Sequence, residues 1–198
     1  MTTLKQTPSQ TVGPYFAYGL CPQQYDFSFR SLFTATLADR EAKGEHIAIV
    51  GQVFDGNGEA VFDAMLEVSQ VDSDGRYPAS REACIASGFR GFARVGTGTD
   101  PQRRFIVDTV KPGRTAPDEA PHLNVIVTMR GMLLHTFTRI YFDDETAANE
   151  RDPVLASVPA ERRATLIARR EPRAGSGAVV YRFDIHMQGE RETVFFDL

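Results

Sequence analysis

The sequence contains no tryptophan and only two cysteines, Cys21 and Cys84, among its 198 residues. The two cysteines could form one disulfide, but they provide neither a disulfide scaffold nor a CxxC metal knuckle. We therefore expect two free thiols, buried or half-buried, as in a protein from a reducing compartment.

Long apolar runs and an excess of positive charge are also absent. The apolar stretches reach only about half a dozen residues, whereas roughly 20 are needed to cross a bilayer. Residues 1–10 are polar and have no apolar core, so we expect no signal peptide. With 22 basic and 26 acidic residues, the net charge of −4 argues against a nucleic-acid-binding protein. These absences predict a soluble, cytoplasmic protein.

Common catalytic motifs are missing too. There is no GxxxxGK[ST] loop, no GxGxxG after a strand, no GxSxG elbow and no HExxH pair. Asp72-Ser73-Asp74-Gly75 resembles part of a calcium loop but lacks the later ligand, so a hairpin turn explains it better. Asp184 and His186 would lie on one side of a strand, a spacing that could serve a metal, but polar neighbours favour a solvated strand face.

A β pattern dominates the chain from His46 onward. The first alternating segment, His46–Val53, ends at Asp55-Gly56-Asn57-Gly58, which supplies the positive φ angles of tight turns. Further strands are predicted at Ala64–Val71, Arg104–Val110, His122–Met129, Leu133–Phe142, Val179–Met187 and Thr193–Phe196. Pro159–Arg170 has the composition of a short amphipathic helix. We predict a mostly β, single-domain β-sandwich over residues 1–198, with one short late helix.

The first fifteen residues differ from this pattern. Met1–Tyr15 carries Pro8, Gly13 and Pro14 and is predicted to form an extended N-terminal arm. Residues 21–44 have no clean period, and we expect them to be irregular.

Two longer segments carry a family resemblance. The first runs from Ile49 to Val68 and continues through the Asp72–Gly75 turn to Tyr77. The second is Lys111-Pro112-Gly113 followed by Ala120-Pro121-His122-Leu123-Asn124. The first resembles the signature of the intradiol ring-cleavage dioxygenases, and the second resembles the iron-binding strand of that family.

Other segments resemble one subunit type of the two-chain members of this family, the type that holds no iron. These segments are Thr7–Thr11, Gly13-Pro14-Tyr15, Arg139–Glu145 and Tyr181–Asp197. The resemblance covers almost the whole chain and is weakest at residues 24–43 and 78–103. It implies a β-sandwich fold and a role as an enzyme subunit.

Members of this family hold a ferric ion with two tyrosines and two histidines, because anionic phenolates stabilise the high oxidation state. The resemblance places the first tyrosine at Tyr77. The second should follow Lys-Pro-Gly, where this chain has Arg114 and Thr115, and no tyrosine occurs between Tyr77 and Tyr141.

The histidine pair of the family is also incomplete. Its first position is His122, and its second is Asn124, whose neutral amide is a poor substitute for imidazole on ferric iron. We call Tyr77, Thr115, His122 and Asn124 the vestigial site and expect it to bind no metal. A cation beside it, Arg114 or Arg139, would repel a metal ion.

The resemblance therefore implies a catalytic, beta-type partner chain that holds Fe(III) and binds a small aromatic substrate, within a large hetero-oligomer. From this chain, it implies that Thr11, Gly13, Pro14 and Tyr15 line the mouth of the partner's active site. It also implies that Arg130 faces the shared cavity, where a guanidinium suits a carboxylated substrate. On its own, Arg130 would be an ordinary hairpin arginine.

Two other functions remain open from the residues. One is a self-sufficient metalloenzyme that uses Tyr77, His122 and a third ligand such as His135. The other is a non-enzymatic binding or scaffold module, since β-sandwiches host many functions. The four histidines are far apart in the sequence, and an isolated histidine is more often structural than a ligand.

Overall fold

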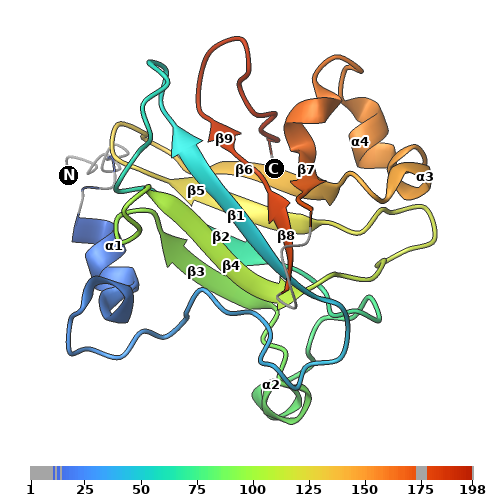
Figure 1. Cartoon of the computed structure of the whole chain (residues 1–198), viewed down its shortest axis with the longest axis horizontal. Helices are drawn as coiled ribbons and strands as arrows, with labels where there is room; N and C mark the ends of the chain where they lie inside the picture. Colours follow the sequence, from blue (N-terminus) through green and yellow to red (C-terminus); the bar gives the residue numbers. More distant parts are fainter. Residues whose placement is uncertain (1–10, 12, 14, 173–177, 198) are drawn as a thin grey trace, which may run out of the picture.

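The computed structural model describes residues 11, 13, 15–172 and 178–197. In this part of the chain, nine strands form one strongly curled sheet (Figure 1). They are β1 (His46–Phe54), β2 (Met65–Ser69), β3 (Phe92–Gly96), β4 (Arg104–Val110), β5 (Leu123–Thr128), β6 (Thr136–Phe142), β7 (Ile167–Arg170), β8 (Val179–Arg182) and β9 (Ile185–His186).

The strands follow the order β3-β2-β5-β6-β7-β8-β1-β4, and β9 pairs with the end of β1. The sheet curls back on itself, so that β1 crosses in front of β5 (Figure 1) and the edge strands β3 and β4 contact each other. Most neighbouring pairs are antiparallel, whereas β1–β8, β1–β9 and β6–β7 are parallel. The mostly β fold predicted from the sequence is confirmed.

The core fills the inside of this curled sheet. In β5, Leu123, Val125 and Val127 are fully buried, and the residues between them are only half-buried. Each such side chain contributes about 1.5–3 kcal/mol when it leaves water. The period-two alternation of the sequence therefore fixes which face of each strand points inward.

The helices are short and lie outside the sheet. They are α1 (Tyr15–Leu20), η1 (Pro22–Tyr25), α2 (Arg81–Ser87), α3 (Thr146–Asn149), α4 (Pro153–Ser157) and η2 (Arg163–Leu166). Figure 1 shows α1 at one side of the sheet and α3 and α4 at the other. None of the described helices is long and apolar enough to span a membrane.

The predicted position of the late helix, Pro159–Arg170, is wrong. The late helices are α3 and α4, whereas the predicted segment forms the single turn η2 and then strand β7. Ile167 and Ala168 pair with β6, and Ala168 is fully buried between β6 and β8. Tertiary pairing overrides the helical propensity of the alanines and arginines here.

Other boundaries also differ from the predictions. The strand predicted at Val179–Met187 is divided into β8 and β9, because the Phe183 carbonyl oxygen turns onto β1. A Cβ on Gly51 would lie 1.7 Å from that oxygen, so only glycine fits. Strand β3 was not predicted, and Thr193–Phe196 forms only a bridge between Phe196 and Phe137.

Near the N-terminus, the predicted extended arm falls largely outside the described residues, and its last residue, Tyr15, begins α1. Cys21 and Cys84 are free thiols, as expected. Burial raises the pKa of Cys21 to about 11, so this thiol is unreactive at neutral pH.

Candidate functional site

Two loops that carry positions of the vestigial site are packed backbone to backbone. The amide of Gly113 donates to the carbonyl oxygen of Asp72 at 2.8 Å. Gly75 has a φ of +80°, and a Cβ there would lie 1.9 Å from the carbonyl oxygen of Arg114. This contact brings the segment that leads to Tyr77 against the segment that leads to Thr115.

Strand β5 adds Asn124 to the same place. The amide nitrogen Nδ2 of Asn124 lies 3.5 Å from the hydroxyl of Tyr77, at the limit of a hydrogen bond. Arg139 of β6 is the register partner of Asn124, so its side chain leaves the sheet on the same face. The expected cation beside the vestigial site is therefore Arg139, which lies directly opposite Asn124.

His122 packs against Tyr141, with ring centroids 5.6 Å apart. It is buried, and its Nδ1 donates to the carbonyl oxygen of Ala120 at 2.9 Å. Burial lowers the pKa of His122, and the charge of Arg139 acts in the same direction. The imidazole is therefore neutral at neutral pH, with the proton on Nδ1 and a lone pair on Nε2.

Asp152 holds this region together and was not singled out from the sequence. Its carboxylate has no exposed surface and accepts from the amides of Ala120 and Leu155, each at 2.8 Å. It also accepts from the hydroxyl of Tyr141 at 3.2 Å. Asp152 is the N-cap of α4, and its partner Ala120 lies 32 residues away in the sequence. The residues around Asp152 therefore give no sequence signal beyond the Asp-Pro pair itself.

The residues at the vestigial site do not fit a four-ligand ferric centre. Tyr77 and His122 are the only phenol and imidazole donors, and the other two positions offer a hydroxyl and an amide. The guanidinium of Arg139, which forms no ion pair within the described part of the chain, adds a positive charge that opposes a cation. Among the described residues, no cluster of three or more histidine, cysteine, aspartate or glutamate side chains could hold a metal.

The alternative ligand set with His135 is contradicted by the sheet register. His122 precedes β5, whereas His135 lies at the far end of the β5–β6 hairpin and is exposed. The six residues of β5 separate the two ends by about 20 Å at 3.3 Å per residue. The two histidines therefore cannot share one metal ion.

A second cluster lies at that far end of the hairpin and contains Arg130. The Nε of Arg130 is 2.9 Å from Oδ2 of Asp63, whose side chain is only 3% exposed, and its guanidinium lies 4.7 Å above the ring of Phe62. The contact with Asp63 is an ion pair and not an aligned hydrogen bond, because both carboxylate oxygens lack a hydrogen-bond partner among the described residues. Half of the Arg130 side chain stays exposed.

The structure brings one predicted arm residue to this cluster. The amide of Gly131 donates to Oγ1 of Thr11 at 2.8 Å, so Thr11 lies beside Arg130. The carbonyl oxygen of Gly13 accepts from the amide of Phe16 at 3.0 Å and leads into α1, where Tyr15 is the first residue. Pro14 lies outside the described residues. Thr11 and Arg130, predicted from segments far apart in the sequence, are thus neighbours.

Comparisons with known proteins match this chain over nearly its full length. The sequence model of the family described as Dioxygenase matches residues 13–189. The protocatechuate 3,4-dioxygenase alpha chain of Burkholderia cepacia is 69% identical over 198 residues, with 100% of both chains covered. The chain belongs to the alpha-chain family of protocatechuate 3,4-dioxygenase.

More distant likenesses agree with this alpha-chain membership. The beta chain of the Burkholderia cepacia enzyme is 27% identical over 207 residues, covering 98% of this chain and 84% of the beta chain. An intradiol ring-cleavage dioxygenase from Tetranychus urticae has a TM-score of 0.61 at 16% identity, covering 91% of this chain and 94% of that one, and shows the shared fold. Intradiol dioxygenases use ferric iron, and alpha and beta chains together imply a hetero-oligomer.

Proposed function

We propose that this chain is the iron-free alpha-type subunit of a protocatechuate 3,4-dioxygenase, and that the beta-type partner holds Fe(III). The observation that carries the proposal is the pairing of Asn124 with Arg139 beside Tyr77. In a chain that matches the family over residues 13–189, an amide stands at a histidine position and a guanidinium lies directly opposite it. This arrangement disfavours a bound cation.

The reaction supported by such a complex is the intradiol cleavage of protocatechuate. Dioxygen adds both of its atoms to the substrate, the bond between the two hydroxylated carbons breaks, and 3-carboxy-cis,cis-muconate is formed. The chemistry takes place at the ferric site of the partner. This chain contributes groups that bind and orient the substrate, and alone it is inactive.

Arg130 is the residue of this chain that we assign to the substrate. A half-exposed guanidinium fixed by Asp63 and Phe62 presents its remaining donors to the outside, where a carboxylate of the substrate can accept them. Thr11 lies beside Arg130, and we propose that Gly13, Pro14 and Tyr15 continue the same edge of the partner's active-site mouth. Glycine and proline allow a backbone to approach a ligand without side-chain bulk.

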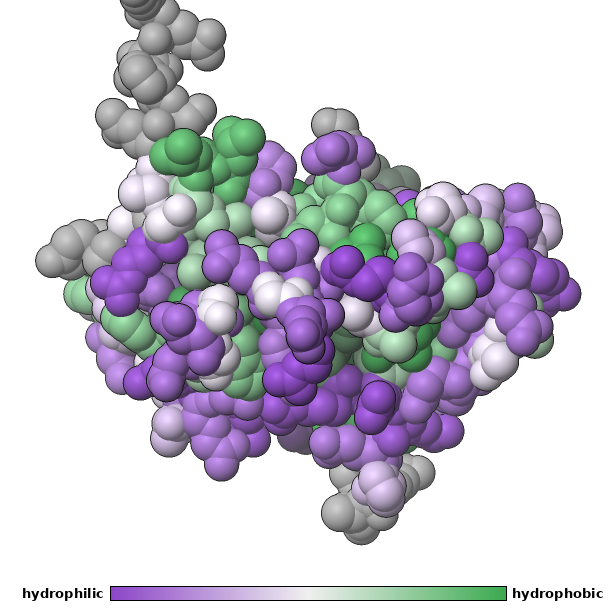
Figure 2. Space-filling view, turned by 90° about the horizontal axis from the view of Figure 1, so that it is seen from above, coloured by the Kyte–Doolittle hydropathy of each residue, from purple (hydrophilic) through white to green (hydrophobic). Residues whose placement is uncertain are grey.

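The surface around this hairpin supports the presence of a partner chain. Leu133 and Leu134 in the β5–β6 connection are 65% and 71% exposed, and Phe62 beneath Arg130 is 42% exposed. Figure 2 shows that hydrophobic side chains gather in the upper part of one face, whereas the lower part is mostly hydrophilic. Exposed apolar side chains next to an arginine are typical of a subunit interface.

Two further proposals concern the chain as a whole. We infer that residues 1–198 form one domain, since a single sheet runs through the fold and the family match spans most of the chain. A cytoplasmic location agrees with two free thiols, Cys21 and Cys84.

Co-expression with the beta-type chain tests the proposed function. The purified complex should turn over protocatechuate and contain one iron per pair of chains, whereas this chain alone should contain no iron and have no activity. Iron that stays with the isolated chain at stoichiometric amounts would contradict the proposal. Failure of the two chains to copurify would also count against it.

A further inference from the structure

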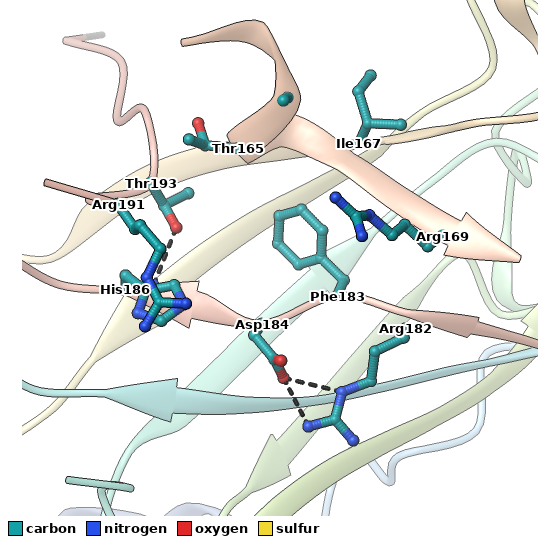
Figure 3. A pocket seen from close by; sticks show the side chains of 10 residues that line it. Thr165, Ile167, Arg169, Arg182, Phe183, Asp184, His186, Arg191 and Thr193 are labelled. Atoms are coloured by element: carbon teal, nitrogen blue, oxygen red, sulfur yellow. Dashed lines mark hydrogen bonds and ion pairs between the residues drawn. The ribbon is translucent and has the colours of Figure 1, made fainter. Parts of the chain in front are cut away.

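A pocket of about 430 Å³ lies on the outer side of the sheet, between β7, the β8–β9 segment and the chain near Thr193 (Figure 3). None of its lining residues belongs to the vestigial site or to the Arg130 cluster. Its volume lies within the range of small-molecule sites.

The wall of this pocket is rich in positive charge. Arg169 and Arg182 are direct partners across the antiparallel β7–β8 pair, where like charges repel, and Arg191 lies on the opposite side. Asp184 is the acidic side chain in the lining, and its Oδ1 is fully engaged by Arg182, at 3.0 Å to Nε, and by the amide of Gln52. Three guanidinium groups against one carboxylate leave two positive charges.

Those two charges belong to Arg169 and Arg191. Neither residue forms an ion pair with another residue in the described part of the chain. In Figure 3, the guanidinium of Arg169 points into the pocket, whereas Arg182 turns toward Asp184. An unpaired arginine beside another arginine is a poor arrangement by itself, and an anion between them removes the repulsion.

The other lining groups include a hydrogen-bond donor and an apolar side chain. The ring of His186 stacks on that of Phe54, with centroids 5.0 Å apart. The backbone amide of His186 donates a hydrogen bond to Oγ1 of Thr193 at 3.0 Å. Burial and Arg191 lower the pKa of His186, so its neutral ring offers one N–H donor. Ile167 is half-buried and lines the pocket, and Phe183 behind it is almost fully buried in the core (Figure 3).

We propose that this pocket binds a small organic dianion, an aromatic or unsaturated dicarboxylate. Arg169 and Arg191 bind the two carboxylates, and the half-buried side chain of Ile167 contacts the apolar body that carries them. Inorganic phosphate has the charge but no apolar body, so it binds more weakly. The site is independent of the proposed role of Arg130, because the two share no residue.

Calorimetric titration of the assembled alpha–beta complex with phthalate tests this site. Wild-type complex should bind phthalate saturably, and Arg169→Ala and Arg191→Ala should each raise the Kd about tenfold, as expected for one lost charge-assisted bond. Arg170→Ala is the matched control, since this neighbour on β7 pairs with Glu45 and Asp144 outside the pocket. Its Kd should equal that of the wild type.

Asp184→Asn gives a result that damage to the fold cannot mimic. The change keeps an oxygen for the amide of Gln52 but frees Arg182, so phthalate should bind several-fold more tightly. Absence of saturable binding at millimolar phthalate, or equal effects of Arg169→Ala and Arg170→Ala, would overturn the proposal. Phosphate that binds as tightly as phthalate would overturn the assignment to an organic dianion.

Discussion

Arg130 and Asp63 form an ion pair of 2.9 Å in which the carboxylate is buried and the guanidinium is half-exposed. This asymmetry leaves the acid inaccessible to a ligand and directs the arginine outward. The pair is separate from the vestigial site, which lies at the opposite end of the β5–β6 hairpin. The chain therefore carries two distinct places where the family resemblance can be tested.

Replacement of Arg130 by alanine should lower kcat/KM for protocatechuate in the assembled complex. The loss should correspond to about 1–3 kcal/mol of transition-state stabilisation, because one charge-assisted bond to the substrate carboxylate is removed. Catechol, which has no carboxylate, should lose much less. Steady-state kinetics on both substrates check this, and equal losses would indicate a structural role for Arg130.

Asp63→Asn should reproduce part of this effect through the arginine. The amide keeps the shape of the side chain but removes the charge that fixes the guanidinium, so kcat/KM for protocatechuate should fall by a factor of roughly 3 to 10. In the double variant with Arg130→Ala, the kinetic loss should be no larger than that of Arg130→Ala alone. Additive losses would show that Asp63 acts independently of Arg130.

Asp152→Ala should be among the most destabilising single changes in this chain. It removes an N-cap and leaves two buried amides and the hydroxyl of Tyr141 without an acceptor, at a cost of roughly 3 to 5 kcal/mol. Denaturant unfolding measures the loss. Asp39→Ala is the control, since its ion pair with Arg90 is exposed and should be worth less than about 1 kcal/mol.

Tyr77→Phe should leave the iron content and the turnover of the complex close to wild type. The side chain is 55% exposed, and its 3.5 Å contact with Asn124 is too long to contribute much. Metal analysis and the visible absorption of the complex provide the measurement. If the ferric–tyrosinate colour disappeared, Tyr77 would be an iron ligand and this chain would contain a metal site.

Deletion of residues 1–14 should leave a folded chain and an iron-loaded complex with impaired kcat/KM. The deletion removes Thr11 and its bond to Gly131, next to Arg130, and none of the described core residues lies in the deleted segment. Iron per complex, particle size and kinetics are measured on one preparation. Unchanged kinetics in an intact complex would contradict a role for the arm at the partner's site.

The sequence predicted best where one local rule decides the structure. Alternation and the turn at Asp55–Gly58 identified β1, and the breakers on either side of an apolar segment identified β5, because both signals lie in neighbouring residues. The prediction failed at Ile167–Arg170, where the choice between helix and strand depends on β6 and β8, which lie far away in the sequence.

The candidate site divides in the same way. The positions Tyr77, His122 and Asn124 were implied by the family resemblance, but the residue opposite Asn124 follows only from the register of β5 and β6. Asp63 and Asp152 had no sequence signal, because each acts through a partner more than thirty residues away. Contacts of this kind follow from the topology of the fold, and the local sequence pattern does not predict them.

The short strand β7 has a consequence for the motions of the molecule. Its first two residues pair only with β6, and its last two pair only with β8, so each side of the sheet is joined to it by two residue pairs. β1 and β4, in contrast, share seven pairs. Local opening begins where the fewest hydrogen bonds must break. Among the sheet strands, amide hydrogen exchange should therefore be fastest in β7, and the sheet should open at β7 before its core strands unfold.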